Sequence, residues 1–181
     1  PEVPALLSEV KRAIGSTDHI ISEMLDYVRE PSRERSVFPL GVAMRRGLAL
    51  VEVPANVSVQ MPEIDGEPHV RGNEDQVTRI LANLMLNGVQ AMPDGGDLTI
   101  ALEGQGEEVC VEVRDTGGGI APENLEKVFD PLFSTKTTGI GLGLAVSRRY
   151  AETHGGRLEA ESQEDAGTVF RLVLKAAEVG N

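Results

Sequence analysis

The stretch from Asp115 to Leu144 contains three motifs in a fixed order: Asp115-Thr-Gly-Gly-Gly-Ile120, Phe129-Asp-Pro-Leu-Phe-Ser-Thr-Lys136 and Gly139-Ile-Gly-Leu-Gly-Leu144. Two glycine-rich turns therefore flank a segment that holds aromatic residues, a proline and a lysine. Glycine has no side chain, so the backbone of such turns can approach a flat ring or a phosphate closely. The pattern indicates a nucleotide site.

The first glycine turn follows directly from an alternating strand pattern at residues 109–113. A carboxylate at a strand end, here Asp115, can accept a hydrogen bond from an exocyclic amine such as the N6 amine of adenine. Alone, the pattern Asp-x-Gly-x-Gly also fits an ordinary turn. The second glycine run opens a predicted helix at Gly143, where free N–H groups and the helix dipole favour phosphate binding. Lys136 adds a positive charge to this region.

Two asparagines, Asn83 and Asn87, lie within a predicted helix at residues 73–92. Their spacing places them on one face of that helix, beside apolar neighbours. Asparagine is a mediocre helix former, so the pair needs a reason. One alternative is a buried polar network. The other is that the amide oxygen of Asn87 binds a magnesium ion that carries phosphate oxygens, because hard cations take oxygen ligands.

The remaining chain alternates between helical and strand patterns. Helices are expected at 37–52, at 73–92, in a short segment that opens at Pro122, and at 143–153. Strands are expected at 57–61, 98–102, 109–113, 158–161 and 169–174, with a second edge strand at 68–71. These elements interleave without regular βαβ repetition, which predicts an α+β two-layer sandwich with a mixed sheet and helices on one face.

Residues 3–28 carry two interleaved heptad series, which form the narrow seam of a coiled-coil-like helix. Packing on its own domain is the plainer alternative, and a bundle with another copy, giving a homodimer through this helix, is the sharper one. Pro31 ends the helix. The expected organisation is a helix at 1–30, a hinge at 31–36, a nucleotide-binding domain at 37–177 and a tail at 178–181.

The composition limits the possible partners. A net charge of −12 argues against binding to nucleic acid or to an anionic membrane, because both require a basic surface. No run of about 18 apolar residues occurs, so we expect no direct membrane contact from this chain. The single cysteine, Cys110, excludes an internal disulfide framework and fits a reducing cytoplasm. Its position in an alternating run predicts an ordinary strand side chain.

Together, these motifs resemble the catalytic, ATP-binding domain of sensor histidine kinases, within the gyrase, heat-shock ATPase, histidine kinase and MutL superfamily. The resemblance covers about residues 72–175. Asn83-Leu-Met-Leu-Asn87 is similar to the N box, and the three opening motifs are similar to the first glycine box, the F box and the second glycine box. Gly167-Thr-Val-Phe170 resembles the closing strand motif, and residues 1–30 resemble the second helix of the dimerisation hairpin.

The resemblance implies a Bergerat-type fold that binds ATP and Mg²⁺. Its implied catalytic residues are Asn87 as the magnesium ligand, Asn83 beside it, and Lys136. Its implied nucleotide-binding residues are Asp115, Gly117, Gly119, Ile120, Phe133, Thr135, Lys136, Gly139, Gly141, Leu142, Gly143, Leu144 and Thr168. The threonine of the closing strand would help Asp115 to hold the adenine.

One position separates the branches of this superfamily. In its hydrolytic members, the residue that matches Asn83 is a glutamate that activates water, and an amide cannot accept that proton. The resemblance therefore favours a histidine kinase, which passes its phosphoryl group to an aspartate of a response-regulator receiver domain, over an ATP-hydrolysing conformational clamp. A nucleotide-binding dimerisation module without transfer activity is a third alternative.

Two features depart from the common family pattern. Many members carry a basic residue where this chain has Gln90, which leaves more of the phosphate contact to Lys136. The segment between Phe133 and Gly139 is short, as in nitrogen-regulator-like kinases. It predicts a small ATP lid and fast nucleotide exchange.

The histidine context expected of a phosphoacceptor, His-Glu/Asp-x-x-Thr/Asn-Pro, does not occur in this chain. His19 has the wrong neighbours, His69 is expected in a strand, and His154 is expected to interact with the carbonyls at its helix end. We therefore expect the acceptor upstream of Pro1, and a start without methionine suggests a fragment. The expected location is cytoplasmic, with a parent protein that can be membrane-anchored.

Overall fold

The computed structural model describes residues 34–62, 68–136 and 139–177, together with Ser32, Ile21, Met24, Leu25, Tyr27 and Val28. Most of the predicted heptad seam lies outside these residues, as do His19 and the predicted tail. The helices are α2 (Leu40–Ala49), α3 (Glu74–Gln90), α4 (Pro122–Leu125) and α5 (Gly143–Thr153). The strands are β1 (Ser36–Pro39), β2 (Val57–Gln60), β3 (His69–Gly72), β4 (Gly96–Gln105), β5 (Glu108–Asp115), β6 (Arg157–Gln163) and β7 (Gly167–Ala177).

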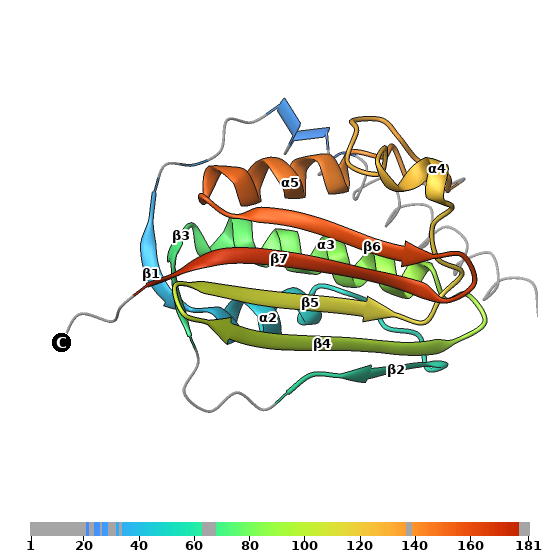
Figure 1. Ribbon diagram of the computed structural model, residues 1–181, viewed down its shortest axis with the longest axis horizontal. Coiled ribbons are helices and arrows are strands. Elements are labelled where there is room, and N and C mark those ends of the chain that lie inside the picture. The colour runs from blue at the N-terminus through green and yellow to red at the C-terminus, as the bar shows by residue number, and fades with distance from the viewer. Residues whose placement is uncertain are drawn as a thin grey trace, which may run out of the picture.

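The described strands form one sheet in the order β1-β3-β7-β5-β4-β2, and β6 pairs with β7. Strands β2 and β4 run parallel, whereas the other pairs are antiparallel, so the sheet is mixed as predicted. Figure 1 shows α2 and α3 behind this sheet, with α5 beside α3. The predicted α+β class, with helices on one face of a mixed sheet, is confirmed.

The start of the domain differs from the sequence-based expectation. Residues 37–39 are not helical; with Ser36 they form β1, which pairs with β3. Pro39 is extended, with φ −71° and ψ 128°, so α2 begins only at Leu40. The strand expected at an edge, at residues 68–71, therefore lies between β1 and β7 instead. Ser36, the last residue of the predicted hinge, lies in β1. The predicted hinge therefore overlaps the folded domain by one residue.

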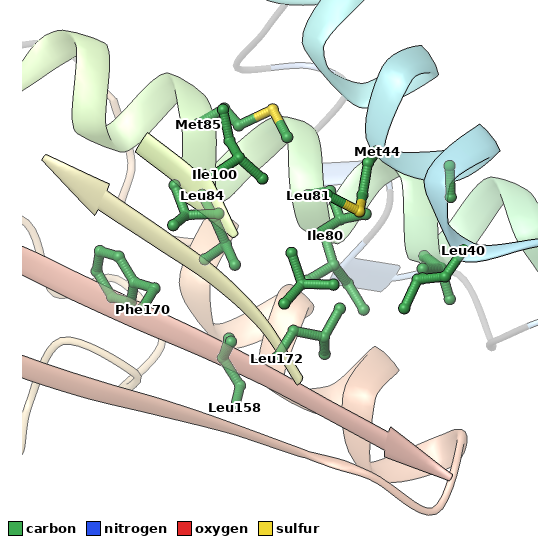
Figure 2. Packing of buried hydrophobic residues seen from close by; sticks show 14 of the residues in the cluster. Leu40, Met44, Ile80, Leu81, Leu84, Met85, Ile100, Leu158, Phe170 and Leu172 are labelled. Atoms are coloured by element: carbon green, nitrogen blue, oxygen red, sulfur yellow. The ribbon is translucent and has the colours of Figure 1, made fainter. Parts of the chain in front are cut away.

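The core lies between α3 and the sheet. The predicted apolar stripe of α3 is fully buried: Val77, Ile80, Leu81, Leu84 and Met85. Figure 2 shows four of these side chains facing Ile100 of β4 and Phe170 and Leu172 of β7. Asn73 caps the helix as predicted, because its Oδ1 accepts the N–H of Gln76 at 3.0 Å. The buried stripe and the cap fix the position of α3, so its polar face points away from this core.

His154 connects the end of α5 to the start of α3. Its ring Nδ1–H donates to the carbonyl of Tyr150 at 2.6 Å, and its Nε2 accepts the backbone N–H of Asn73 at 2.9 Å. The expected interaction of His154 with its helix-end carbonyls is confirmed. Burial lowers the pKa of His154 below its ordinary value, and the nearby charge of Arg35 acts in the same direction. The neutral ring is therefore the form that joins the two helices.

Stability should consequently fall in mild acid. A histidine with a lowered folded pKa takes up its proton more readily in the unfolded chain, so its contribution is full above about pH 6.5. That contribution declines as the pH falls towards the folded pKa. We expect urea unfolding to show a larger loss of stability between neutral and acidic pH for the wild type than for His154→Leu. At neutral pH, His154→Leu itself should cost about 1–3 kcal/mol, because the buried N–H of Asn73 loses its acceptor.

Part of the predicted dimerisation helix contacts α5. The guanidinium of Arg149 donates to the carbonyl of Tyr27 at 2.7 Å and lies 5.6 Å from the centre of its ring. Leu25 and Val28 remain exposed, at 64% and 82%. The packing of this helix with a second copy stays a prediction. Within the described part of the chain, no helix combines the length and the apolar character needed to cross a membrane.

Candidate nucleotide-binding site

The two asparagines of α3 form a hydrogen-bonded row that runs from α5 to the solvent side of the helix. Asn83 donates through Nδ2 to the hydroxyl of Ser147 on α5 at 3.1 Å. Asn87 donates through Nδ2 to Oδ1 of Asn83 at 3.4 Å. Both side chains are half-buried. The two asparagines thus form a half-buried polar network, and Oδ1 of Asn87 faces outward from it.

Lys136 covers that outward oxygen. Its Nζ donates to Oδ1 of Asn87 at 2.8 Å and to Oε1 of Gln90 at 2.7 Å. The ammonium group stands where a cation can bind two hard oxygen donors. Magnesium prefers oxygen ligands and retains several waters, so this pair of amide oxygens fits a partly hydrated magnesium ion that also binds nucleotide phosphates. The residue that departs from the family pattern, Gln90, belongs to this group.

Asp115 lies at the other end of the site, where β5 ends between β4 and β7. It is only 4% exposed. Its Oδ1 accepts the backbone N–H groups of Gly117 at 2.9 Å and of Thr168 at 3.3 Å. Burial raises the pKa of Asp115, while these two N–H groups and the charge of Lys136 lower it. Since both hydrogen bonds from described residues end on Oδ1, Oδ2 can accept one from a ligand.

The backbone of α3 passes close to this carboxylate. A Cβ placed on Gly88 would lie 2.6 Å from Cδ1 of Leu98, 3.3 Å from the Cβ of Asp115 and 3.7 Å from its Oδ2. The glycine therefore lets α3 pack directly against Leu98 and the side chain of Asp115. Gly88 directly follows Asn87, so the carboxylate and the amide oxygen border the same turn of α3.

Ser162 is a site residue that the sequence analysis missed. Its hydroxyl accepts the N–H of Ile120 at 2.8 Å, contacts Oγ1 of Thr168 at 2.9 Å and donates to the carbonyl of Gly167 at 2.8 Å. These contacts join the first glycine turn to the closing strand. The available signal was weak, because Ser162 stands one residue beyond the strand predicted at 158–161.

The first glycine turn packs against the end of α3. A Cβ on Gly117 would lie 2.4 Å from the carbonyl oxygen of Ala91, a distance that backbone atoms do not tolerate. Gly118 has nothing within 4 Å of the same position and donates its N–H to that carbonyl at 3.4 Å. The close approach therefore depends on Gly117 and not on its neighbour.

Gly117→Ala should accordingly destabilise the domain by about 1–3 kcal/mol through overpacking and should weaken ATP binding. Gly118→Ala is the matched control, and we expect it to change stability by no more than about 0.5 kcal/mol. Thermal unfolding and calorimetric titration with ATP measure both effects. Equal behaviour of the two variants would contradict the close approach as the reason for the glycine.

The second glycine run folds together with the preceding motif. Gly141 has φ +71°, and a Cβ there would lie 2.2 Å from the carbonyl oxygen of Phe133. Its own carbonyl accepts the N–H of Leu132 at 3.0 Å. Helix α5 begins at Gly143 as predicted, and the side chain of its N-cap residue, Leu142, makes no capping hydrogen bond. The first N–H groups of α5 therefore resemble an anion-binding helix start.

The structure thus gathers most of the predicted residues into two groups. One group contains Asp115, Gly117, Gly119, Ile120 and Thr168, and the other contains Asn83, Asn87 and Lys136, together with Gln90 and Ser147. Leu142 is buried, Phe133 and Leu144 are half-buried, and Thr135 and Gly139 are exposed. Cys110 is a half-buried strand residue, as expected.

Comparisons with known proteins identify the family. The family model described as histidine kinase-, DNA gyrase B-, and HSP90-like ATPase matches residues 72–178. The sensor histidine kinase ZraS of Escherichia coli (strain K12) is 34% identical over 176 residues, which is 96% of this chain and 38% of ZraS. Sporulation kinase C of Bacillus subtilis (strain 168) is 31% identical over 174 residues, 93% of this chain and 40% of that protein. The chain spans about two fifths of the length of these relatives.

Solved structures show the same fold. The catalytic domain of histidine kinase ThkA is 27% identical, with a TM-score of 0.67, and the match covers 78% of this chain and 97% of that one. Full-length ShkA in complex with AMPPNP has a TM-score of 0.77 at 20% identity, which shows the fold alone; the match covers 99% of this chain and 40% of ShkA. With its motifs, its fold and a family model over most of its length, the chain belongs to the histidine kinase-, DNA gyrase B- and HSP90-like ATPases.

Proposed function

We propose that this chain is the catalytic domain of a sensor histidine kinase, which binds ATP with Mg²⁺ and donates the γ-phosphoryl group to a histidine. The observation that carries this proposal is that Asp115 and the outward oxygen of Asn87 border one turn of α3. A carboxylate suited to an adenine amine and an oxygen suited to a cation thereby lie at two ends of one site. The relatives' names support the same reading.

Each group has a defined part in the transfer. Oδ2 of Asp115 accepts the N6 amine of the adenine, and the uncapped start of α5 receives the phosphates. Asn87, with Gln90 beside it, would hold the magnesium ion, which would supply neutralisation of phosphate charge. The ammonium group of Lys136, which contacts these two oxygens in the structure, would then leave them to the ion and contact the phosphates. Catalysis then consists of positioning the γ-phosphate and stabilising its charge.

ATP hydrolysis by a conformational clamp is the competing function within the family. The position that would carry the water-activating carboxylate holds Asn83, whose amide is engaged with Ser147 and Asn87. An amide cannot accept the proton of an attacking water. We therefore propose that the γ-phosphoryl group is kept for a protein nucleophile and then passes to a response-regulator aspartate.

The test combines binding with transfer. Calorimetric titration should show magnesium-dependent binding of ATP, and steady-state hydrolysis should stay slow. When the chain is mixed with a histidine-bearing dimerisation hairpin and γ-labelled ATP, acid-labile, base-stable label should appear on the hairpin. ATP binding without transfer would favour a nucleotide-binding module, and rapid hydrolysis would favour the clamp.

A further inference from the structure

We propose that Ser147 is a positioning residue that sets the orientation of the Asn87 amide toward the cation. The inference rests on the proposed Mg-ATP function of the site. Ser147 is 2% exposed and faces α3 from α5. Its hydroxyl accepts the Nδ2–H of Asn83 at 3.1 Å. It lies two side chains away from the cation position, so it acts on the metal only through the two asparagines.

An amide side chain has a donor end and an acceptor end, so the orientation of one asparagine determines that of the next. Asn87 can receive a cation only when Oδ1 points outward, as it does toward the Nζ of Lys136 at 2.8 Å. Its NH2 group then points inward, to Oδ1 of Asn83 at 3.4 Å. Asn83 must in turn direct its own NH2 group at an acceptor. Ser147 supplies that acceptor and ends the chain.

Loss of the Ser147 hydroxyl removes the acceptor that holds the Asn83 amide in this orientation. The NH2 group of Asn83 would have no acceptor on α5, and a polar group left without a partner favours a rearrangement. Rotation of Asn83 by half a turn would point its NH2 group at Asn87. Asn87 would then turn its oxygen inward and present its NH2 group to the cation. The partial positive charge of the NH2 hydrogens would repel the cation.

The experiment measures how much Mg²⁺ improves ATP affinity, by calorimetric titration in Mg²⁺ and in EDTA. We expect Ser147→Ala to reduce this magnesium-dependent gain about 10-fold, as is typical when a partner of a metal ligand is removed. ATP affinity in EDTA should stay within about twofold of wild type. Ser147→Thr keeps the hydroxyl and should retain most of the gain. Alanine is the best helix former, so Ser147→Ala should fold.

Two further variants separate orientation from general packing. Thr78→Val removes another buried hydroxyl, which has no hydrogen-bond partner among the described residues, and should leave the gain unchanged. Asn87→Asp presents an oxygen in either orientation, so adding Ser147→Ala to it should change the gain by less than about twofold.

An unchanged gain in Ser147→Ala, or equal losses with Mg²⁺ and with EDTA, would overturn the inference while leaving the proposed function standing. The inference is also overturned if Ser147→Thr behaves like Ser147→Ala, because the hydroxyl is then not what orients the Asn87 amide. If the unsubstituted chain binds no ATP, the proposed function fails first, and the inference fails with it.

Discussion

Asp115→Asn is expected to weaken ATP binding about 100-fold while the domain stays folded. An amide oxygen can still accept the N–H groups of Gly117 and Thr168, so the local hydrogen bonds survive. The other atom becomes an NH2 donor, which faces the donor amine of adenine. A hydrogen bond to a charged group contributes about 1.5–3 kcal/mol, and this one is replaced by a repulsive contact.

Calorimetric titration with ATP, together with thermal unfolding, measures this effect. Asp94→Asn is the matched control, because Asp94 carries an exposed carboxylate in the turn after α3. We expect its ATP affinity to equal that of the wild type. An unchanged ATP affinity in a folded Asp115→Asn variant would remove Asp115 from the proposed adenine contact.

The raised pKa of Asp115 predicts that ATP affinity depends on pH. Burial raises the pKa of Asp115, and its protonated form loses the acceptor that the adenine amine needs. ATP affinity should therefore decline as the pH falls through this raised pKa, at a higher pH than for an exposed aspartate. Asp115→Asn has no such group and should lack this part of the pH dependence, which titrations over a pH series can compare.

Asn87→Ala should lower the rate of phosphoryl transfer on the order of 100- to 1000-fold, the usual cost of removing one group that stabilises transition-state charge. It removes an oxygen that contacts the cation position and keeps the hydrogen bond from Lys136 to Gln90. ATP affinity in EDTA should change much less, because the adenine end is intact. Transfer from γ-labelled ATP to a histidine hairpin gives the rate.

Asn87→Asp keeps an oxygen at the cation position and serves as the comparison for Asn87→Ala. We expect it to retain magnesium-dependent ATP binding, with a rate between those of wild type and Asn87→Ala. Full transfer activity in Asn87→Ala would contradict the role of this residue and would favour a nucleotide-binding module that needs no cation ligand.

Local patterns in the sequence were sufficient to predict most elements. The stripe of α3 follows helical spacing, and Asn73 is both its predicted and its observed cap. Helix α5 has the predicted bounds, since Gly143 follows the glycine run and Gly155 and Gly156 end it. In each case the signal and the structure lie within a few neighbouring residues, so backbone preference and burial of one face decide the outcome.

Elements whose structure depends on distant partners were predicted less well. Residues 37–39 fit a helical apolar spacing, but backbone pairing with β3 makes them a strand. Ser162 looked like a residue beyond a strand end, yet it joins Ile120 to Thr168. A short segment carries too little local preference to outweigh such pairing.

The motifs and their periodicity were enough to predict the family and the kinds of elements, because motif spacing and periodicity are local properties. Which side chains meet depends on the tertiary structure: Lys136 contacts Gln90, and Ser147 contacts Asn83. These contacts join segments far apart in the chain. Their geometry follows from how α5 and the segment that ends at Lys136 pack on α3, and packing distances are not encoded in the spacing of residues along one segment.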